Sequence, residues 1–425
     1  MEHRWLYGWT LASIAFGGAS LIVPLYVVEL GGDAFTLGVL FAASSFIGIP
    51  GALLFGRLAD RTGKFRSFVL FSMAIAFAML LVIPALESIL AVIAVYAILW
   101  LGFAAAIPVL TLLVIVDIPE AEWSANIALL NKMQGIGWTV GLLVGFALIA
   151  VLTIQLDTIT AQRIFLLVCA SSTAIGFLIS MSTLPPNPTP SAVPSARRLR
   201  RGRLTAGAYN VRASSFPFAP TRIDIRQFHP RRFIDRFTPR LASYYLAVVI
   251  VFSGFGIFFA PLPVYLGEVG FGASEIFALY FLLNIAAVLY FERASHLVSR
   301  HDASLVQFGG LTVRAITFVA VVMIGLSLGA GLLGLGLTTL MFIMIGLTWA
   351  VIAVTAATLI TQLSPPIIRG EALGTYNALI AMAGGVGGLL GGWLGAMSYP
   401  IAFTVASALV VTGGVVVLLV RRMIG

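Results

Sequence analysis

The sequence predicts an all-α polytopic membrane protein with twelve transmembrane helices arranged in two six-helix repeat halves. Three observations predict this fold class: composition, the length of the apolar runs and an internal repeat. The 425 residues are 60% hydrophobic and only 10% charged, whereas soluble proteins carry about 25% charged residues. Apolar runs of about 20 residues, long enough to cross a bilayer as a helix, recur from one end of the chain to the other.

The apolar runs place the twelve predicted helices along the chain. The first run lacks the small-residue cleavage site of a signal peptide, so we expect it to be a spanning helix. The predicted spans are 5–29, 35–57, 67–86, 88–116, 122–152, 162–184, 241–267, 274–295, 304–326, 331–362, 371–396 and 399–420.

Basic residues orient these helices. When the spans alternate from a cytoplasmic N-terminus, nearly every Lys and Arg between or beside the spans lies on the cytoplasmic side. Only Arg163 lies on the outer side of the membrane. This asymmetry is the positive-inside pattern of membrane proteins. Both termini are therefore expected in the cytoplasm. Scarce lysine, abundant arginine and short loops suggest a prokaryotic plasma membrane.

Residues 185–240 separate the two halves, 1–184 and 241–425, and carry 12 Arg against Asp224 and Asp235. We expect disorder over 185–215, because that stretch cannot bury a core. The segment 223–237 is either a short amphipathic stretch on the membrane surface or a solvated linker. The net charge of +9 resides in this one segment. It therefore indicates attraction to the lipid bilayer and not to nucleic acid.

The halves are related by an internal repeat. At an offset of 239 residues, the end of the first helix recurs at the end of the seventh, and at an offset of 246 the fifth helix recurs in the eleventh. Parallel repeats of this kind build several transporter folds. The matching pairs are Pro24 and Pro263, Tyr26 and Tyr265, Glu29 and Glu268, Gly31 and Gly270, Pro119 and Pro365, Asn131 and Asn377, Gly141 and Gly387, and Gly145 and Gly391.

A short motif joins the second and third spans. Residues 56–64 read Gly-x-Leu-Ala-Asp-Arg-x-Gly-Lys, followed by Phe65 and Arg66. This motif resembles the loop between helices 2 and 3 of the major facilitator superfamily of secondary transporters, from which it departs at Phe65, with the second cation one position late at Arg66. The resemblance extends over the chain except 185–240. It implies the superfamily's fold, alternating access and a substrate site near the midplane between the halves.

The motif is predicted to form a conformational latch on the cytoplasmic side. Asp60 is expected to contact Arg61, Arg369 or the free amides at the start of the eleventh helix, where the helix dipole favours a carboxylate. Asp117 is the expected partner of Arg61 or Lys64. The predicted latch comprises Gly56, Asp60, Arg61, Gly63, Lys64, Asp117 and Arg369.

Polar groups inside spans are costly and are therefore functional candidates. Lys132 either faces a cavity, where it could meet an anionic group, or snorkels to the cytoplasmic surface. The tryptophans could line a substrate site or simply pack in the core. Asn131 and Asn377 are cavity-lining by the resemblance. The substrate-binding candidates are Asn131, Lys132, Trp138, Asn284, Trp349 and Asn377.

Three charged groups suggest further roles. Glu29 and Glu268 are repeat-related acids near the outer ends of helices 1 and 7. They are candidates for proton coupling, and the alternative is a pair of solvated interfacial acids. Arg314 lies within the ninth span, where snorkelling or an interhelical hydrogen bond is expected rather than substrate binding.

Other chemistry finds little support. The chain has a single cysteine, Cys169, and its four histidines lack metal-ligand spacing, so no metal or cofactor is expected. No catalytic or phosphate-binding motif lies in a suitable context, so we do not expect an enzyme. Drug–proton antiporters of this superfamily typically have a Gly-Pro pair in the fifth helix and an arginine in the fourth. This sequence has neither feature, which weakens an assignment to that subfamily.

The expected function is transport of a small-molecule substrate by a monomer, with export favoured and proton coupling as one option. Uptake of a sugar or an organic acid is the alternative. A receptor that uses a transporter fold without transporting is a second alternative from a different class.

Overall fold

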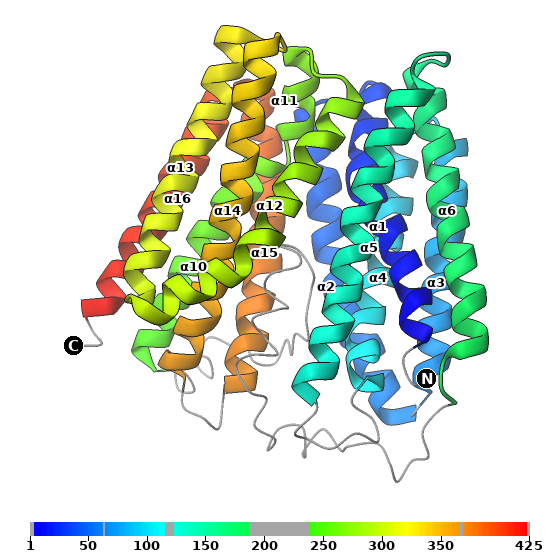
Figure 1. The fold of residues 1–425 in the computed structure, drawn as a ribbon, viewed down its shortest axis with the longest axis horizontal. Helices are drawn as coiled ribbons and strands as arrows, with labels where there is room; N and C mark the ends of the chain where they lie inside the picture. The colour runs from blue at the N-terminus through cyan, green and yellow to red at the C-terminus, as the bar shows by residue number, and fades with distance from the viewer. Residues whose placement is uncertain (1–3, 63, 115–122, 187–237, 365–368, 423–425) are drawn as a thin grey trace. The chain divides into compact units, whose positions relative to one another are not determined.

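The computed structural model describes residues 4–62, 64–114, 123–186, 238–364 and 369–422. Within those ranges every regular element is a helix (Figure 1). The first helices along the chain are α1 (Trp5–Glu29), α2 (Ala34–Thr62), α3 (Phe65–Val82), the short 3-10 helix η1 (Ile83–Ala85), α4 (Ile89–Leu113), α5 (Trp123–Leu152) and α6 (Thr158–Thr183). The later helices are α10 (Pro239–Phe259), α11 (Leu262–Val269), α12 (Ala273–Arg300), α13 (Ala303–Leu328), α14 (Leu332–Leu363), α15 (Arg369–Met397) and α16 (Tyr399–Arg422).

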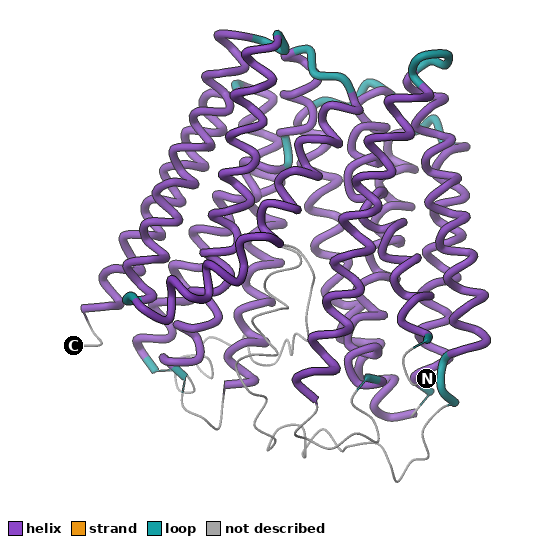
Figure 2. Tube along the Cα trace, viewed as in Figure 1, coloured by secondary structure: helices purple, strands orange, loops and turns teal. Residues whose placement is uncertain are grey.

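The helices confirm the predicted all-helical class. Eleven helical segments in the described residues are long and apolar enough to cross a membrane, with α10 and α11 counted together. The remaining predicted span corresponds to α2, whose described apolar stretch Ala34–Gly48 is shorter. Between successive helices the described part of the chain forms short loops and turns (Figure 2). The predicted linker 185–240 lies almost wholly outside the described residues, so its boundaries, disorder and surface segment stay predictions.

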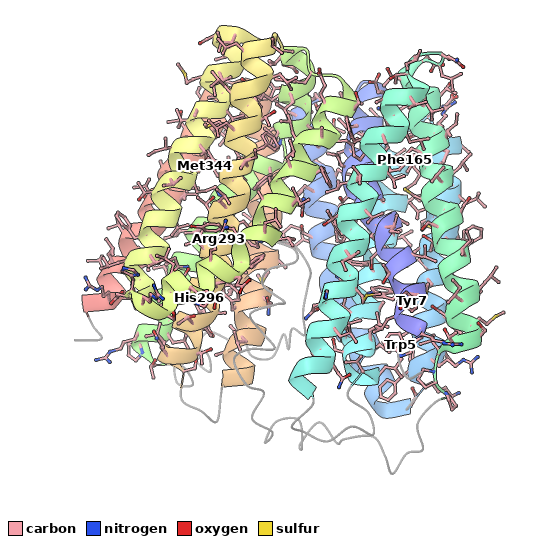
Figure 3. The ribbon with its side chains drawn as sticks, in the orientation of Figure 1. Trp5, Tyr7, Phe165, Arg293, His296 and Met344 are labelled. Atoms are coloured by element: carbon pink, nitrogen blue, oxygen red, sulfur yellow. The ribbon has the colours of Figure 1, made fainter. Side chains whose placement is uncertain are left out.

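The described residues form two compact units. The first unit contains α1, α2 from Ala43 onward and α3 to α6, and the second contains Gly31–Ala42 and α10 to α16. In the first unit α1 packs against α5 and α6, while α3 packs against α4 and α6. Trp5 is buried and Tyr7 is exposed, so different faces of α1 point inward and outward (Figure 3). In the second unit α10 packs against α15 and α16, and α14 packs against α12 and α13.

Glycines bring repeat-related helix pairs into backbone contact. A side chain on Gly141 of α5 would collide with the carbonyl of Ile14 on α1, and one on Gly387 of α15 would collide with the carbonyl of Ser253 on α10. The repeat offsets of 246 and 239 carry the first contact onto the second. Small residues permit this close approach, which holds helices together by packing within lipid. The internal repeat is therefore visible in the contacts of each unit.

The predicted end of the second helix was wrong. α2 continues to Thr62, so Gly56, Asp60 and Arg61 lie on its last turns and not in a loop, and α3 begins at Phe65. Leu, Ala and Arg are good helix formers, and a single glycine costs a helix only about 1 kcal/mol, so the helix continues through the motif.

The predicted span 241–267 is present, but the structure divides it into two helices. α10 ends at Phe259, and α11 begins at Leu262. Pro261 has no N–H to donate to the carbonyl of Ile257, and its ring obstructs the preceding turn. The amide of Ala260 still bonds to the Gly256 carbonyl at 3.1 Å. By contrast, Pro24 lies inside the unbroken helix α1.

The eighth predicted helix is longer than expected. α12 extends to Arg300, beyond the predicted end at 295, so Arg293 and His296 lie on the helix itself (Figure 3). Both side chains are exposed. Residues 291–296, where the predicted span ends, therefore continue the helix.

Candidate functional site

A cluster of aromatic rings occupies the core of the first unit. We define the first aromatic cluster as Phe16 of α1, Trp100 and Phe103 of α4, and Trp138 of α5. The rings of Phe16 and Phe103 lie 4.2 Å apart between centroids, and those of Trp100 and Trp138 lie 6.2 Å apart. Trp138 is only 6% exposed. The candidate Trp138 therefore lies in a packed cluster that joins three helices.

A matching cluster occupies the second unit. We define the second aromatic cluster as Phe252 and Phe255 of α10, Trp349 of α14 and Tyr376 of α15. The Trp349 ring lies 6.2 Å from Phe252 and 6.4 Å from Phe255. The repeat offset of 239 carries Phe16 onto Phe255, and the offset of 246 carries Phe103 onto Trp349. Two rings of each cluster therefore stand at repeat-related positions, and the other two rings of each do not.

A buried cation, Arg314, packs against the Phe255 ring of the second aromatic cluster. Arg314 of α13 is 1% exposed. Its Nε donates to Thr348 Oγ1 of α14 at 2.8 Å, and a terminal nitrogen donates to the Ile345 carbonyl. The guanidinium carbon lies 5.0 Å from the centre of the Phe255 ring. The expected interhelical hydrogen bond is confirmed, and burial rules out snorkelling for this side chain.

The first unit has a different contact at the corresponding place. The offsets carry Arg314 back to Ile75 of α3 and Thr348 back to Gly102 of α4. These two residues also face one another, because a Cβ on Gly102 would lie 3.3 Å from Cγ2 of Ile75. The same helix contact is therefore apolar in the first unit and cationic in the second.

The predicted polar candidates lie in different environments. Asn131 of α5 is 7% exposed, and its amide nitrogen has no hydrogen-bond partner among the described residues. Its repeat partner Asn377 donates to the Leu373 carbonyl at 2.9 Å, and Asn284 of α12 donates to the Tyr280 carbonyl at 2.9 Å. Lys132 is exposed. Both interpretations of Lys132, cavity and snorkelling, stay predictions.

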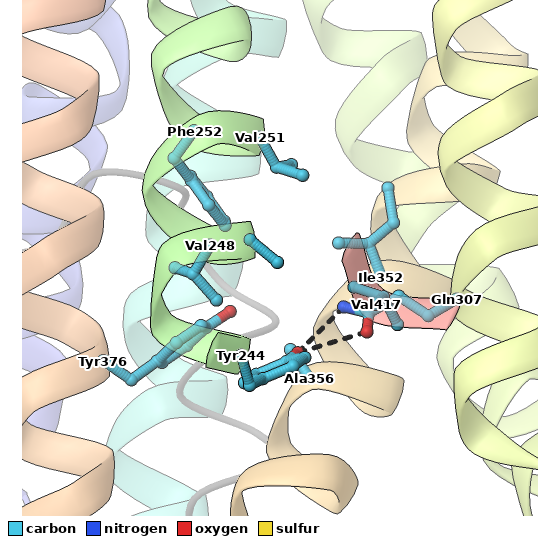
Figure 4. A pocket seen from close by; sticks show the side chains of 10 residues that line it. Tyr244, Val248, Val251, Phe252, Gln307, Ile352, Ala356, Tyr376 and Val417 are labelled. Atoms are coloured by element: carbon cyan, nitrogen blue, oxygen red, sulfur yellow. Dashed lines mark hydrogen bonds between the residues drawn. The ribbon is translucent and has the colours of Figure 1, made fainter. Parts of the chain in front are cut away.

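A narrow hollow opens beside the second cluster, between α10 and α13 to α16 (Figure 4). It has room for about one water molecule. The Tyr244 hydroxyl accepts from Gln307 Nε2 at 3.0 Å on one side, and Tyr376 reaches toward the hollow from the other (Figure 4). The hollow is too small for a solute and belongs to the interior packing of this unit.

Most of the predicted latch lies where the structure gives no side-chain contacts. Gly63 and Asp117 lie outside the described residues, and so do the side chains of Asp60, Arg61 and Arg369, while Gly56 is described only by its place in α2. Lys64 is exposed and precedes α3 without capping it through its side chain. The late cation Arg66 donates to the Met181 carbonyl at the end of α6, at 2.6 Å. Cations bind well at the C-terminal carbonyls of a helix.

The two units differ around a repeat-related tyrosine, Tyr26 near the end of α1 and Tyr265 in α11. In the first unit the buried Tyr26 donates to the Leu86 carbonyl at 2.8 Å and accepts from Arg163 Nε at 3.2 Å. In the second, Tyr265 donates to the Val322 carbonyl at 2.8 Å. Tyr26 therefore links the end of α1 to the loop before α4 and to α6, and Tyr265 links α11 to α13.

The two candidate acids, Glu29 and Glu268, are both exposed. Glu268 of α11 accepts a hydrogen bond from the Tyr399 hydroxyl of α16 at 2.7 Å. Glu29 ends α1, and nearby Asp33 caps α2. Hydrogen bonds from the Thr36 hydroxyl and amide hold the pKa of Asp33 below its usual value. Proton exchange by Glu29 and Glu268 stays a prediction.

Comparison with known proteins identifies the family to which this chain belongs. The family model described as Major Facilitator Superfamily matches residues 2–142 and 118–384. The chain belongs to the major facilitator superfamily. It is thus a multi-pass membrane protein of a transporter superfamily and not an enzyme. A relative from Bacillus subtilis (strain 168), the uncharacterized MFS-type transporter YddS, is 32% identical over 164 residues, which are 37% of this chain and 33% of that protein.

Solved structures of other superfamily members have the same fold. A mutant of the nucleoside transporter NupG aligns with a TM-score of 0.74 at 13% identity over 100% of both chains. A bacterial homolog of the human lysosomal transporter Spinster aligns with a TM-score of 0.69 at 14% identity, over 99% of this chain and 94% of that one. A POT family transporter aligns with a TM-score of 0.71 at 13% identity, over 99% and 96%. At these identities the likeness shows the fold alone.

Sequence reasoning missed several partners of the candidate residues. The ring pairs Phe16–Phe103 and Phe255–Trp349 would have followed from applying the two repeat offsets to every aromatic position. The Arg314–Thr348 bond had no local signal, because it joins residues 34 positions apart on two different helices. Applying the same two offsets to Arg314 and Thr348 gives Ile75 and Gly102, so the difference between the two units could nevertheless have been read from the sequence.

Proposed function

We propose that the chain is a secondary active transporter that moves a small solute across the plasma membrane by alternating access, with export as the favoured direction. The observation that carries the proposal is the superfamily match, which extends over both halves. The repeated glycine contacts support it, because closely packed seams allow helices to rock without opening voids. The functional unit is proposed to be a monomer, with both termini in the cytoplasm.

The proposed solute contacts are the six candidates named from the sequence. Asn131 has the best support, because a buried amide nitrogen without a partner among the described residues is costly unless something binds it. Trp138 and Trp349 would supply apolar surface from the two clusters, as ligand sites are lined mainly by such side chains with few polar groups. Lys132, Asn284 and Asn377 complete the proposal.

Carrier and receptor are separated by flux. A thermal-shift screen of the purified protein against metabolites and drugs identifies binders, and the binders are then loaded into proteoliposomes with a pH gradient imposed or collapsed. A carrier moves the bound solute across the membrane, and a proton-coupled carrier does so faster with the gradient. Saturable binding without any movement would favour the receptor instead.

The latch is proposed to hold the cytoplasmic side shut through Asp60. Asp60→Asn is expected to shift the protein toward an inward-open state, since a neutral amide loses the attraction to the latch cations and to helix amides. Accessibility labelling of single cysteines introduced on the cytoplasmic side, in a Cys169→Ala background, measures the shift. Asp33→Asn, at the opposite end of α2, is the matched control. Unchanged labelling and normal flux in the Asp60 variant would contradict the latch.

Proton coupling is proposed to use Glu29, Glu268 or both. Their place at the outer ends of repeat-related helices is what supports the idea. The pair Glu29→Gln and Glu268→Gln removes both titrating groups while leaving the shape nearly unchanged. If transport by the double variant keeps its full dependence on pH, these two acids have no part in coupling.

A further inference from the structure

The buried arginine of the second unit calls for an explanation beyond packing. All the contacts that the structure gives Arg314 are with neutral groups: Thr348, the Ile345 carbonyl, and the rings of Phe255 and Phe318. Among the described residues no carboxylate pairs with it. An uncompensated charge inside a membrane protein is expensive and marks function by default.

The first unit shows that the scaffold does not need this charge. Ile75 and Gly102 make the repeat-related contact without a charged group, and a Cβ on Gly102 would also meet the Ser72 carbonyl oxygen at 3.3 Å. Phe16 and Phe103 form a ring pair in the first unit, and Phe255 and Trp349 form the repeat-related pair in the second. The two units therefore have matching aromatic pairs, and only one has a cation behind it. A purely structural arginine would not explain this asymmetry.

The charge is close enough to act on anything that contacts the second aromatic cluster. The guanidinium lies 5.0 Å from the Phe255 ring, and Phe255 lies 6.4 Å from the Trp349 ring. Arg314 is therefore within about 11 Å of Trp349. At roughly 10 Å and an effective dielectric constant of about 20, a unit charge changes the binding of another unit charge by roughly tenfold.

We propose that Arg314 is a specificity-determining residue that favours anionic solutes at the second aromatic cluster. It acts through its field and without touching the solute, because Phe255 and Phe318 cover it. The ligand class is a small organic anion with an apolar body for the rings, such as a carboxylate or a sulfonate. The inference rests on the proposed transport function for its biological meaning, but its test does not require transport.

The chain's single cysteine makes a charge-sensing experiment direct. In a Cys169→Ala background, Trp349→Cys places one thiol at the second cluster. Its labelling rate is measured in the intact protein in liposomes with two methanethiosulfonate reagents of similar size, one bearing a sulfonate and one a trimethylammonium. Each rate is divided by the rate with free thiol, so that the ratio of the two reports the local potential.

Charge-free variants at position 314 then test the cause. Arg314→Gln and Arg314→Met are each expected to lower the anion-to-cation labelling ratio at least tenfold. Arg314→Lys keeps the charge and is expected to preserve the ratio within about threefold. Arg163→Gln removes a half-buried arginine in the first unit and is expected to have no effect at position 349.

Three results would overturn the inference. One is a ratio that does not change when the charge is removed. Another is failure of both reagents to label position 349, since the second cluster would then never meet a solute. The last is failure of both charge-free variants to fold by gel filtration, since the arginine would then be a structural requirement. Loss of flux with the labelling ratios as expected would instead contradict the transport proposal and leave the charge effect standing.

Discussion

The first and second units share several contacts at repeat-related positions and differ at others. In both, a glycine of α5 or α15 meets a backbone carbonyl of α1 or α10, and a buried aromatic pair joins α1 to α4 or α10 to α14. Behind that pair the first unit has Ile75 against Gly102, and the second has Arg314 bonded to Thr348. Shared contacts define the scaffold, so the differing contact is where function is to be sought.

A second difference lies in the backbone. α1 runs unbroken through Pro24, whereas its counterpart is divided into α10 and α11 at Pro261. The repeat offset places Ile22 of α1 opposite Pro261. One added proline therefore accounts for the break, since the proline shared by both repeats does not interrupt α1.

Adding a buried arginine to the first unit is expected to have the largest effect on stability. Ile75→Arg places a cation beside Gly102, which has no side chain to accept a hydrogen bond. The expected cost is about 3 kcal/mol or more, whether the side chain faces protein or lipid. Thermal unfolding followed by gel filtration measures the loss. The control Ile75→Met keeps the volume and should cost less than about 1.5 kcal/mol. Equal stability of the arginine and methionine variants would mean that the two contacts are interchangeable.

Disturbing the shared scaffold should harm both units alike. Gly141→Ala and Gly387→Ala each push a methyl group into a backbone carbonyl, at an expected cost of about 1–3 kcal/mol. Gly309→Ala of α13 is the matched control, because its Cβ meets nothing within 4 Å and alanine favours a helix by about 1 kcal/mol. Chemical denaturation of the three variants makes the comparison. A large loss at one of the two seams alone would show that the units are not packed alike.

Repairing the broken helix is expected to have a smaller effect. Pro261→Ile restores the residue of the first unit and supplies an N–H for the Ile257 carbonyl. We expect amide hydrogen exchange over 259–266 to slow by roughly tenfold, equivalent to about 1.4 kcal/mol of local stability. Pro24→Ala in the unbroken α1 is the control, with little change expected. Unaltered exchange in the isoleucine variant would show that Pro261 does not cause the break.

The smallest expected effect concerns the starts of α3 and α13. Lys64 does not cap α3 through its side chain, whereas Asp302 caps α13 by accepting from the amides of Ser304 and Leu305. Asp302→Ala is expected to cost about 1 kcal/mol or less, and Lys64→Ala almost nothing. Partial burial opposes ionisation of Asp302, but the Leu305 amide and Arg421 outweigh it and lower its pKa.

The pH dependence of that cap follows from the lowered pKa. The stability that ionised Asp302 contributes is present above its unfolded pKa near 3.8, and it is lost as the pH falls through the lower folded pKa. The difference in unfolding midpoint between the parent and Asp302→Ala should therefore be constant at neutral pH and shrink in acid below that value. A difference that grows in acid would contradict this assignment.

Much of the fold could be predicted from the sequence, because span length and apolar composition are local properties. The repeat was also readable, since Asn131 and Asn377 share one offset with Gly141 and Gly387. Helix ends were less predictable. α2 continues through a motif that its glycines suggested was a loop, and the break before α11 depends on which of two nearby prolines stops the helix.

The site was less predictable than the fold, because burial and partners come from tertiary packing. The sequence placed Arg314 in a peripheral span and suggested snorkelling or an interhelical bond. Only the structure shows that it is buried and bonded to Thr348 behind Phe255. The unpartnered amide of Asn131 likewise has no signature in the sequence that separates it from Asn377, whose amide is satisfied within its own helix.

The two units share a scaffold, and among the described residues only the second has a buried arginine beside its ring pair. The most direct test of this central claim compares thiol labelling at the two repeat-related ring positions in one background. In the Cys169→Ala protein, Phe103→Cys and Trp349→Cys are labelled separately with the sulfonate and trimethylammonium reagents, with Arg314 in place in both. A normalised anion-to-cation ratio at least tenfold higher at 349 than at 103 is the predicted result. Equal ratios at the two positions would contradict the claim that Arg314 favours anions at the second aromatic cluster.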